Sequence, residues 1–185
     1  MRLFTGIALP ADIADNLNRL IDGLRPAAHF KWTPAYNLHL TTKFIGEWPE
    51  DRLPELTGVL ATLRRGRAPI AISVAGIGWF PNPHHPRVLW TGVKAGPDLA
   101  QLAADTDEAV ATLGIARETK PYSPHLTLAR IKDVVPLTKI RQAIADLPSA
   151  DFGSFVADRF HLYLSKPGPT GSIYTKLAEI PLLPE

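Results

Sequence analysis

The tripeptide His-Leu-Thr occurs twice in this chain, at residues 39–41 and again at residues 125–127. With 6 His, 24 Leu and 14 Thr among 185 residues, random order would give two copies in roughly two of a thousand shuffled sequences. The copies are 86 residues apart, close to half of the chain. This spacing indicates two related lobes that each carry one copy.

Hydrophobic periodicity surrounds each copy with strands and helices. The pattern predicts strands over residues 3–9, 37–45, 70–79, 87–94, 125–131, 155–164 and 172–180. It predicts helices over residues 11–24, 50–65, 98–113 and 137–147. Each motif therefore lies on a strand, and the fold class is α+β. No Gly- or Ser-rich linker separates the two lobes, so we expect them to pack as a single domain over residues 1–185.

The composition is that of a globular protein that folds alone, with 45% hydrophobic and 21% charged residues. The chain has no Cys, which excludes disulfides and thiolate chemistry. Its net charge of +2 does not by itself indicate a nucleic-acid partner. The first residues are interpreted as a strand rather than a signal peptide, and no stretch has the apolar length of a membrane span. We expect a cytoplasmic protein with no membrane association.

Two His-x-Thr strands that face each other would suit phosphoryl chemistry. Side chains alternate along a strand, so His39 and Thr41 share one face, as do His125 and Thr127. A neutral imidazole can take a proton from an attacking hydroxyl while a protonated one gives a proton to the leaving oxygen. The Thr hydroxyls can donate to the non-bridging phosphate oxygens. Neither motif supplies the three or four ligands of a metal site, so we expect neither a metal nor another cofactor.

A single His-x-Thr is more often a half-buried structural pair, and it is the duplication that favours catalysis. Other polar clusters are interpreted as structural. His84 and His85 lie in a Pro-rich stretch that reads as the connection between two strands, although a substrate loop or partial metal site is the alternative. The cations Arg64, Arg65 and Arg67 follow a predicted helix and are interpreted as a solvated helix end. His29 and His161 carry no supporting pattern.

Longer stretches around the motifs resemble a known family. FKWTPAYNLHLTTKFIGEW and PYSPHLTLAR are similar to the motif regions of the two-histidine (2H) phosphoesterases, specifically the LigT-like RNA 2′,3′-cyclic phosphodiesterases, also called 2′-5′ RNA ligases. RLFTGIALP, RVLWTGV and LYLSKPGPTGSIYTKLAEIPL resemble the family's opening strand, middle strand and closing ribbon. The resemblance covers nearly the whole chain. It implies a bilobal, pseudo-symmetric fold of two antiparallel sheets flanked by helices around a central cleft.

The resemblance also implies a reaction, the hydrolysis of RNA or nucleotide 2′,3′-cyclic phosphate to the 2′-phosphate without a metal, with 2′-5′ RNA ligation as the reverse. It assigns His125 as the base that activates water and His39 as the acid that protonates the departing 3′-oxygen. Thr41, Thr127 and Arg130 would bind the phosphate. Thr42 replaces the Leu more usual in the family, and we expect its side chain to point away from the site.

Arg130 lies five residues after His125, so strict alternation aims it at the opposite face of the strand. To reach a phosphate it must sit at a strand end or a bulge. Phe30, Trp32 and Tyr122 flank the motifs and are candidates for stacking on a nucleobase. Packing in the core is at least an equal expectation for Trp32.

Two alternatives remain beside this hypothesis. One is a phosphodiesterase of the same superfamily that acts on small cyclic nucleotides or on an ADP-ribose cyclic phosphate. The other is a non-catalytic RNA-end binding module whose histidines only bind phosphate, which a turnover assay distinguishes from an enzyme. The expected partners are RNA 3′ ends or nucleotides with a 2′,3′-cyclic phosphate, and we expect a monomer.

Overall fold

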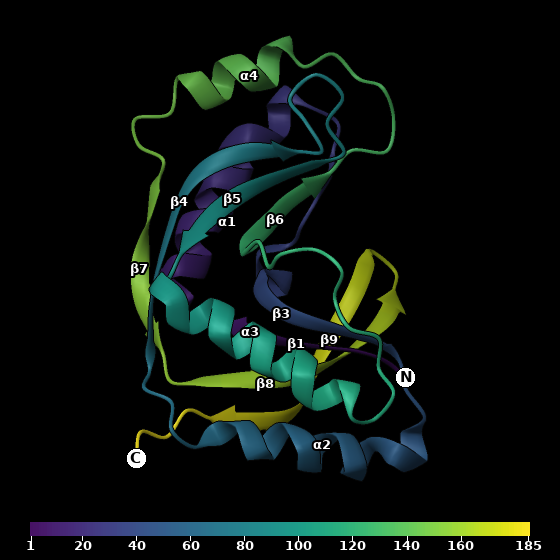
Figure 1. The fold of residues 1–185 in the computed structure, drawn as a ribbon. Helices are drawn as coiled ribbons and strands as arrows, with labels where there is room; N and C mark the ends of the chain where they lie inside the picture. The colour runs from purple at the N-terminus through teal and green to yellow at the C-terminus, as the bar shows by residue number, and fades with distance from the viewer.

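Nine strands form two antiparallel sheets in the computed structural model, which describes residues 1–185. Helices α2 and α3 lie along one sheet, while α1 and α4 lie beside the other (Figure 1). The predicted α+β class with two antiparallel sheets flanked by helices is confirmed. None of the helices combines the length and apolar character needed to cross a bilayer.

The first sheet has four strands in the order β3-β1-β8-β9. These strands are β1 (Arg2–Ala8), β3 (His39–Glu47), β8 (Arg159–Gly168) and β9 (Gly171–Pro181). The second sheet has five strands in the order β2-β6-β5-β4-β7 and curls around its concave face (Figure 1). These strands are β2 (Lys31–Trp32), β4 (Ile70–Phe80), β5 (Val88–Lys94), β6 (His125–Arg130) and β7 (Asp151–Ala157).

Four α-helices and four single 3-10 turns complete the chain. The α-helices are α1 (Ala11–Leu24), α2 (Leu53–Ala61), α3 (Gly96–Ala111) and α4 (Thr138–Ala145). The 3-10 turns are η1 (Arg25–Ala27), η2 (Ala35–Asn37), η3 (Glu50–Arg52) and η4 (Thr62–Arg64). The predicted helix 50–65 is therefore α2 with a 3-10 turn at each end, since Pro54 at its start and the tightening last turn limit the regular helix.

The lobes are not the two halves of the sequence, which corrects the simplest interpretation of the motif spacing. Strands β8 and β9 return from the end of the chain to join β1 and β3 in the first sheet. Helix α1 follows β1 of the first sheet but contacts β7 of the second. Both termini therefore belong to the same lobe, although each sheet does carry one His-Leu-Thr copy.

The predicted strand 155–164 is wrong. The chain forms two strands there, β7 and β8, which separate at Asp158 and join different sheets. Apolar residues alternate on both sides of this residue, and no Gly or Pro marks the corner. The local pattern therefore gave no signal for the change of sheet. The two-residue strand β2 was also not predicted, because it is too short to show a period.

Buried apolar side chains from both sheets form one continuous cluster. Helix α1 shows how the sequence builds it, since its buried residues recur at helical spacing along one face: Ile13, Leu17, Leu20, Ile21 and Leu24. Leu40 and Leu126, the central residues of the two motifs, both belong to this cluster. The core thus anchors each motif strand by its Leu and leaves the flanking His and Thr on the other face.

Candidate active site

The two motif strands come from different sheets and contact each other where the sheets meet (Figure 1). Both have the same burial pattern, in which the His and the Thr are half-buried and the Leu between them is buried. His39 and Thr41 pair with Ala8 and Gly6 of β1, so both belong to the face opposite the core. The structure thus presents two similar His-x-Thr faces, one from each sheet.

Strand β3 contains a bulge directly after its motif. Thr41 pairs with Gly6, but the next pair joins Lys43 to Thr5, so Thr42 is an extra residue. The Thr42 and Thr5 hydroxyl oxygens lie 2.7 Å apart in a buried hydrogen bond. As expected, Thr42 points away from the motif face.

Strand β6 contains a bulge at the equivalent place. Thr127 pairs with Trp90 and Ala129 pairs with Leu89, so Leu128 is the extra residue. The two copies therefore share a five-residue geometry as well as a tripeptide. Bulges of this kind re-aim the side chains that follow them.

The bulge in β6 returns Arg130 to the motif face. Arg130 pairs with Val88, two residues from the Trp90 that faces Thr127, so the two β6 side chains lie on one face. The structure therefore supplies the bulge that a phosphate contact required. Lys31 of β2 pairs directly with Arg130, and both side chains are exposed. Like charges that oppose each other across strands are unfavourable, and a bound anion would relieve the repulsion.

The bulge in β3 places Phe44 in the position that corresponds to Arg130. Phe44 pairs with Phe4, two residues from the Gly6 that faces Thr41. It is 65% exposed, unusual for a Phe. The sequence interpretation missed both Lys31 and Phe44, although the offset of five residues after each motif His was the signal for Phe44.

The two imidazoles are held in the same way. Nδ1 of His39 lies 2.7 Å from the carbonyl oxygen of Asn37, and Nδ1 of His125 lies 2.8 Å from that of Ser123. A carbonyl can only accept a hydrogen bond, so each Nδ1 carries the proton. In the neutral ring Nε2 is then the basic nitrogen, free to accept or return a proton.

Aromatic rings surround His39. Its ring centroid lies 4.6 Å from that of Phe4, 4.9 Å from Tyr174 and 5.9 Å from Tyr163. Burial lowers the pKa of His39 below its ordinary value, and the hydrogen bond with the Asn37 carbonyl opposes this shift only in part. In the free protein His39 is therefore mainly neutral near pH 7. His125 makes one aromatic contact, an edge-on packing at 5.2 Å against Phe80.

The three candidate stacking residues, Phe30, Trp32 and Tyr122, make contacts within the protein. Tyr122 donates a 2.8 Å hydrogen bond from its hydroxyl to the Thr41 carbonyl, and burial raises its pKa. Trp32 pairs with buried Ala129, so it lies on the face opposite Lys31, and its indole donates to the Ala28 carbonyl. Phe30 packs against Trp32 at 5.5 Å. Their stacking role stays a prediction, whereas Phe44 exposes an aromatic side chain on the motif face.

Each motif strand is bound by the segment that precedes the other motif. Before the first motif, β2 pairs with β6, and Thr33 N–H donates to the Leu128 carbonyl at 2.8 Å. Before the second motif, Tyr122 binds the Thr41 carbonyl, and the Lys43 amine donates to the Ala116 carbonyl at 2.8 Å. These links cross between the lobes in both directions and fix the strands relative to each other.

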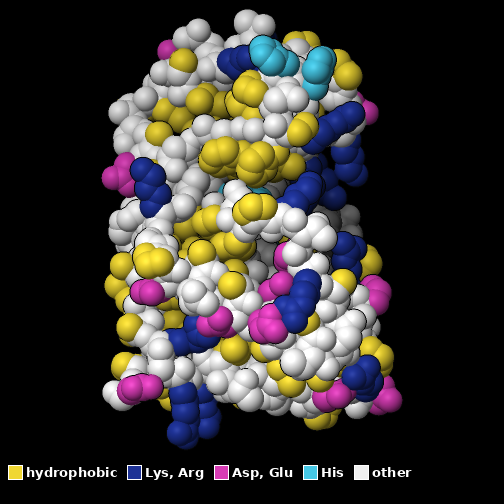
Figure 2. Space-filling model, in the orientation of Figure 1, with side chains coloured by type: hydrophobic (Ala, Val, Ile, Leu, Met, Phe, Trp, Pro, Cys, Tyr) yellow, Lys and Arg dark blue, Asp and Glu magenta, His cyan; other side chains and the backbone are white.

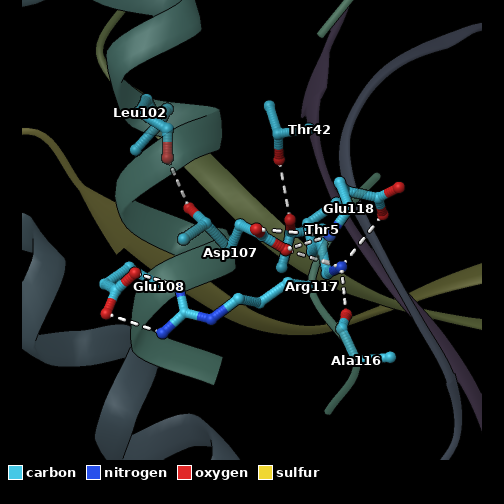
Figure 3. Close-up of polar contacts among 10 residues, drawn as sticks. Thr5, Thr42, Leu102, Asp107, Glu108, Ala116, Arg117 and Glu118 are labelled. Atoms are coloured by element: carbon cyan, nitrogen blue, oxygen red, sulfur yellow. Dashed lines mark hydrogen bonds and ion pairs between the residues drawn. The ribbon is translucent and has the colours of Figure 1, made fainter. Parts of the chain in front are cut away.

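The buried Lys43 amine is the centre of a polar cluster under β3. Figure 3 shows its partners Asp107, Ala116 and Glu118. Its amine lies 2.7 Å from the Asp107 carboxylate of α3 and 2.9 Å from that of Glu118. Burial opposes the charge on the amine, but the two carboxylates outweigh it and raise the pKa of Lys43. The bulge accounts for this position, because it turns both Thr42 and Lys43 toward the helix side.

The face in Figure 2 is hollowed across its middle, between the lobes. Hydrophobic side chains gather around this hollow, and Lys and Arg side chains lie along its right edge. His84 and His85 are exposed in the β4–β5 connection, where the Asn82 side chain accepts both of their backbone N–H groups, which is the turn that the sequence indicated. No three His, Asp or Glu side chains come together in a way that could hold a metal ion.

Comparisons with known proteins cover most of the chain. Residues 7–90 and 93–174 match the family described as LigT like Phosphoesterase. A protein of Methanothermobacter thermautotrophicus named RNA 2′,3′-cyclic phosphodiesterase is 33% identical over 178 residues, which is 96% of each chain. One of the same name from Thermus thermophilus is 33% identical and covers 98% of this chain and 90% of its own.

Solved structures give the same match in three dimensions. The crystal structure of TT0787 of Thermus thermophilus has a TM-score of 0.83 at 33% identity and covers 98% of each chain. The crystal structure of E. coli LigT complexed with 3′-AMP has a TM-score of 0.79 at 26% identity and covers 98% of this chain and 97% of that one. The similarity thus extends from one end of the fold to the other.

Proposed function

The chain belongs to the LigT-like phosphoesterase family, and from this premise we propose that it is an RNA 2′,3′-cyclic phosphodiesterase. It hydrolyses the cyclic phosphate at an RNA or nucleotide end and leaves a 2′-phosphate. The observation that carries the proposal is the duplicated geometry: two bulged strands each present a Thr hydroxyl and an imidazole whose Nδ1 is committed to a carbonyl. Relatives with this name are 33% identical over nearly their whole length, which supports the substrate class.

The proposed reaction is an in-line displacement at phosphorus. His125 takes a proton from water through Nε2 as the water oxygen attacks. The bond to the 3′-oxygen breaks, and His39 gives that oxygen a proton. Each proton transfer contributes about 10²–10⁴-fold to the rate. The 2′-oxygen keeps the phosphate, and replacement of water by the 5′-hydroxyl of another RNA would give the 2′-5′ linkage.

Hydroxyl and guanidinium donors stabilise the charge on phosphate during this step. Thr41 and Thr127 donate to the non-bridging oxygens from opposite strands, and Arg130 approaches from the bulged end of β6. Donors placed where charge develops stabilise the transition state without reorganisation. The exposed side chain of Phe44 offers a stacking surface to the nucleobase. This surface favours a nucleotide substrate over a phosphodiester without a base.

The acid role requires a protonated His39, whereas burial lowers its pKa in the free protein. A bound phosphate diester carries a negative charge, which favours the charged imidazole and opposes the effect of burial. Substrate binding therefore favours the protonated form of His39 that the acid role requires. The same anion shields the repulsion between Arg130 and Lys31.

A short RNA with a 2′,3′-cyclic phosphate tests the proposal directly. We expect hydrolysis to a 2′-phosphate end, identified by ³¹P NMR or by resistance of the product to a 3′-specific phosphatase. His125→Ala should abolish turnover, and Lys139→Ala, which removes an exposed cation from α4, should not. Binding of the RNA without turnover would favour the non-catalytic module instead. The monomeric state and the cytoplasmic location stay predictions.

A further inference from the structure

A cavity of about 370 Å³ lies between the end of β1 in the first sheet and the end of β7 in the second. It is lined by the end of β1 (residues 7–10), by the corner between β7 and β8 (residues 155–159), and by His161, Lys176 and Glu179. This volume is within the usual range of pockets for small organic ligands. About half of the lining residues are hydrophobic and the rest are mostly charged. Such a lining suits a ligand with an apolar part and an anionic part.

The cavity lies one strand away from the first motif. Ala8, which lines it, is the residue that pairs with His39. His161 pairs with Gly6, and Gly6 pairs with Thr41, so all three lie in one row across the sheet. Neighbouring strands are about 4.8 Å apart, which places His161 about 10 Å from Thr41.

Gly6 lies between Thr41 and His161 in this row. It has no side chain, and a Cβ added there would come 2.8 Å from the Leu40 carbonyl oxygen, so the position accepts no larger residue without movement. Between Thr41 and His161 this row therefore carries no side chain. A substrate held at Thr41 can extend across the sheet toward the cavity.

Two polar residues that line the cavity, His161 and Lys176, lack hydrogen-bond or ion-pair partners for a nitrogen atom. Arg159 binds the carboxylates of both Asp158 and Glu179. His161 is 3% exposed, its Nε2 lies 3.4 Å from Glu179, and its Nδ1 has no hydrogen-bond partner. Lys176 is exposed and forms no ion pair. Buried polar groups are normally paired, so the unpaired Nδ1 of His161 indicates a polar ligand. The exposed Lys176 amine is available to bind an anionic part of that ligand.

We propose that this cavity binds the nucleotide on the 5′ side of the one that carries the cyclic phosphate. Lys176 contacts the phosphodiester between the two nucleotides, and His161 lies behind it with its unpaired nitrogen. The apolar wall at Leu9 and Val156 contacts the upstream nucleoside. The terminal base then lies toward Phe44, beyond Thr41 in β3, and the strand leaves the site across β1 and β8. The protein therefore selects RNA ends over cyclic mononucleotides.

This inference rests on the proposed function, and a pair of substrates separates the two. We would measure kcat/KM for adenosine 2′,3′-cyclic phosphate and for the dinucleotide ApA with a 2′,3′-cyclic phosphate. The wild-type protein should prefer the dinucleotide. Lys176→Ala should reduce kcat/KM for the dinucleotide roughly ten-fold, the size expected for a hydrogen bond to a charged group. It should leave the mononucleotide unchanged.

Two further variants control the measurement. Val156→Glu puts a negative charge into the cavity at a side chain that is 65% exposed, so it should fold and should also lower only the dinucleotide rate. Lys139→Ala removes the same charge as Lys176→Ala from exposed α4 and should change neither. Equal kcat/KM for both substrates in the wild type, or an equal loss for both in Lys176→Ala, would overturn the subsite. Absence of turnover on either substrate would overturn the proposed function itself.

Discussion

Replacing Lys43 with Met should destabilise the folded protein by about 2–3 kcal/mol. The Lys43 side chain is 2% exposed and its amine makes three polar contacts, to Asp107, Glu118 and the Ala116 carbonyl. Removing one partner of a buried ion pair costs about 3–5 kcal/mol, because the other charge is left uncompensated. Asp107 is 18% and Glu118 53% exposed, so water compensates part of this loss. Met retains the apolar stem.

Thermal unfolding at neutral pH measures this loss. In a chain of this length 1 kcal/mol corresponds to about 2–4 °C in Tm, so the variant should melt roughly 4–12 °C below the wild type. Arg117→Met is the matched control, since it breaks the neighbouring Arg117–Glu108 pair, whose side chains are 56% and 68% exposed. Exposed pairs contribute little, so this variant should melt close to the wild type.

The pH dependence gives a second check on the same cluster. Burial works against the Asp107 charge, but the hydrogen bond and charge of Lys43 outweigh it and lower the Asp107 pKa. A lowered carboxyl pKa contributes stability that is present above the unfolded value of 3.8 and is lost as pH falls through the folded value. The difference between wild type and Lys43→Met should therefore shrink in acid. If Lys43→Met and Arg117→Met had the same Tm at neutral pH, the buried ion pairs of Lys43 would not stabilise the fold as argued.

Three predictions concern the reaction. Excess EDTA should leave the rate of cyclic phosphate hydrolysis unchanged, because the proposed acid, base and phosphate donors are all side chains; a loss that a divalent ion restores would contradict this. Thr41→Val and Thr127→Val should each slow turnover by about 10²–10³-fold with an unchanged fold, while His84→Ala and His85→Ala should match wild type in the same assay. The acid must be protonated, and burial lowers the pKa of His39, so the midpoint of the alkaline limb of the kcat/KM profile should lie below pH 6.5. A His39-dependent limb that rises with pH would mark His39 as a base.

Short-range patterns in the sequence were sufficient to identify the motif faces. Strand alternation alone put His39 with Thr41 and His125 with Thr127, because each tripeptide precedes the bulge that would have broken the period. The period of helix α1 was equally clear, and its predicted bounds agree with the structure. These features depend only on residues that are close together in the sequence, within one or two helical turns or a few strand residues.

The membership of the sheets could not be derived in this way. Whether a strand joins the first or the second sheet depends on partners more than a hundred residues away, as for β1 and β8. The corner at Asp158 has no local signal for the same reason. Lys43 is a related case, since a Lys in a strand is expected to be exposed and only the carboxylates of Asp107 and Glu118 make its burial favourable.

The position of Phe44 follows from the repeat. The offset of Arg130 from His125 already required a bulge or a strand end in the second copy. Applied to the first copy, the same offset leads from His39 to Phe44. The pseudo-symmetry of the two strands therefore predicts the exposed aromatic, although neither copy does so alone.

The central claim is that His39 and His125 act on one phosphate as acid and base. A phosphodiester with a nitrophenolate leaving group tests it most directly, because such a leaving group departs without a proton whereas a ribose oxygen does not. His39→Ala should lose the RNA cyclic phosphate activity but keep most of its activity on the nitrophenyl ester. His125→Ala should lose both, since water must give up its proton in either reaction. Rescue of His125→Ala but not of His39→Ala would reverse the roles, and wild-type rates on the RNA substrate in both variants would contradict the catalytic account.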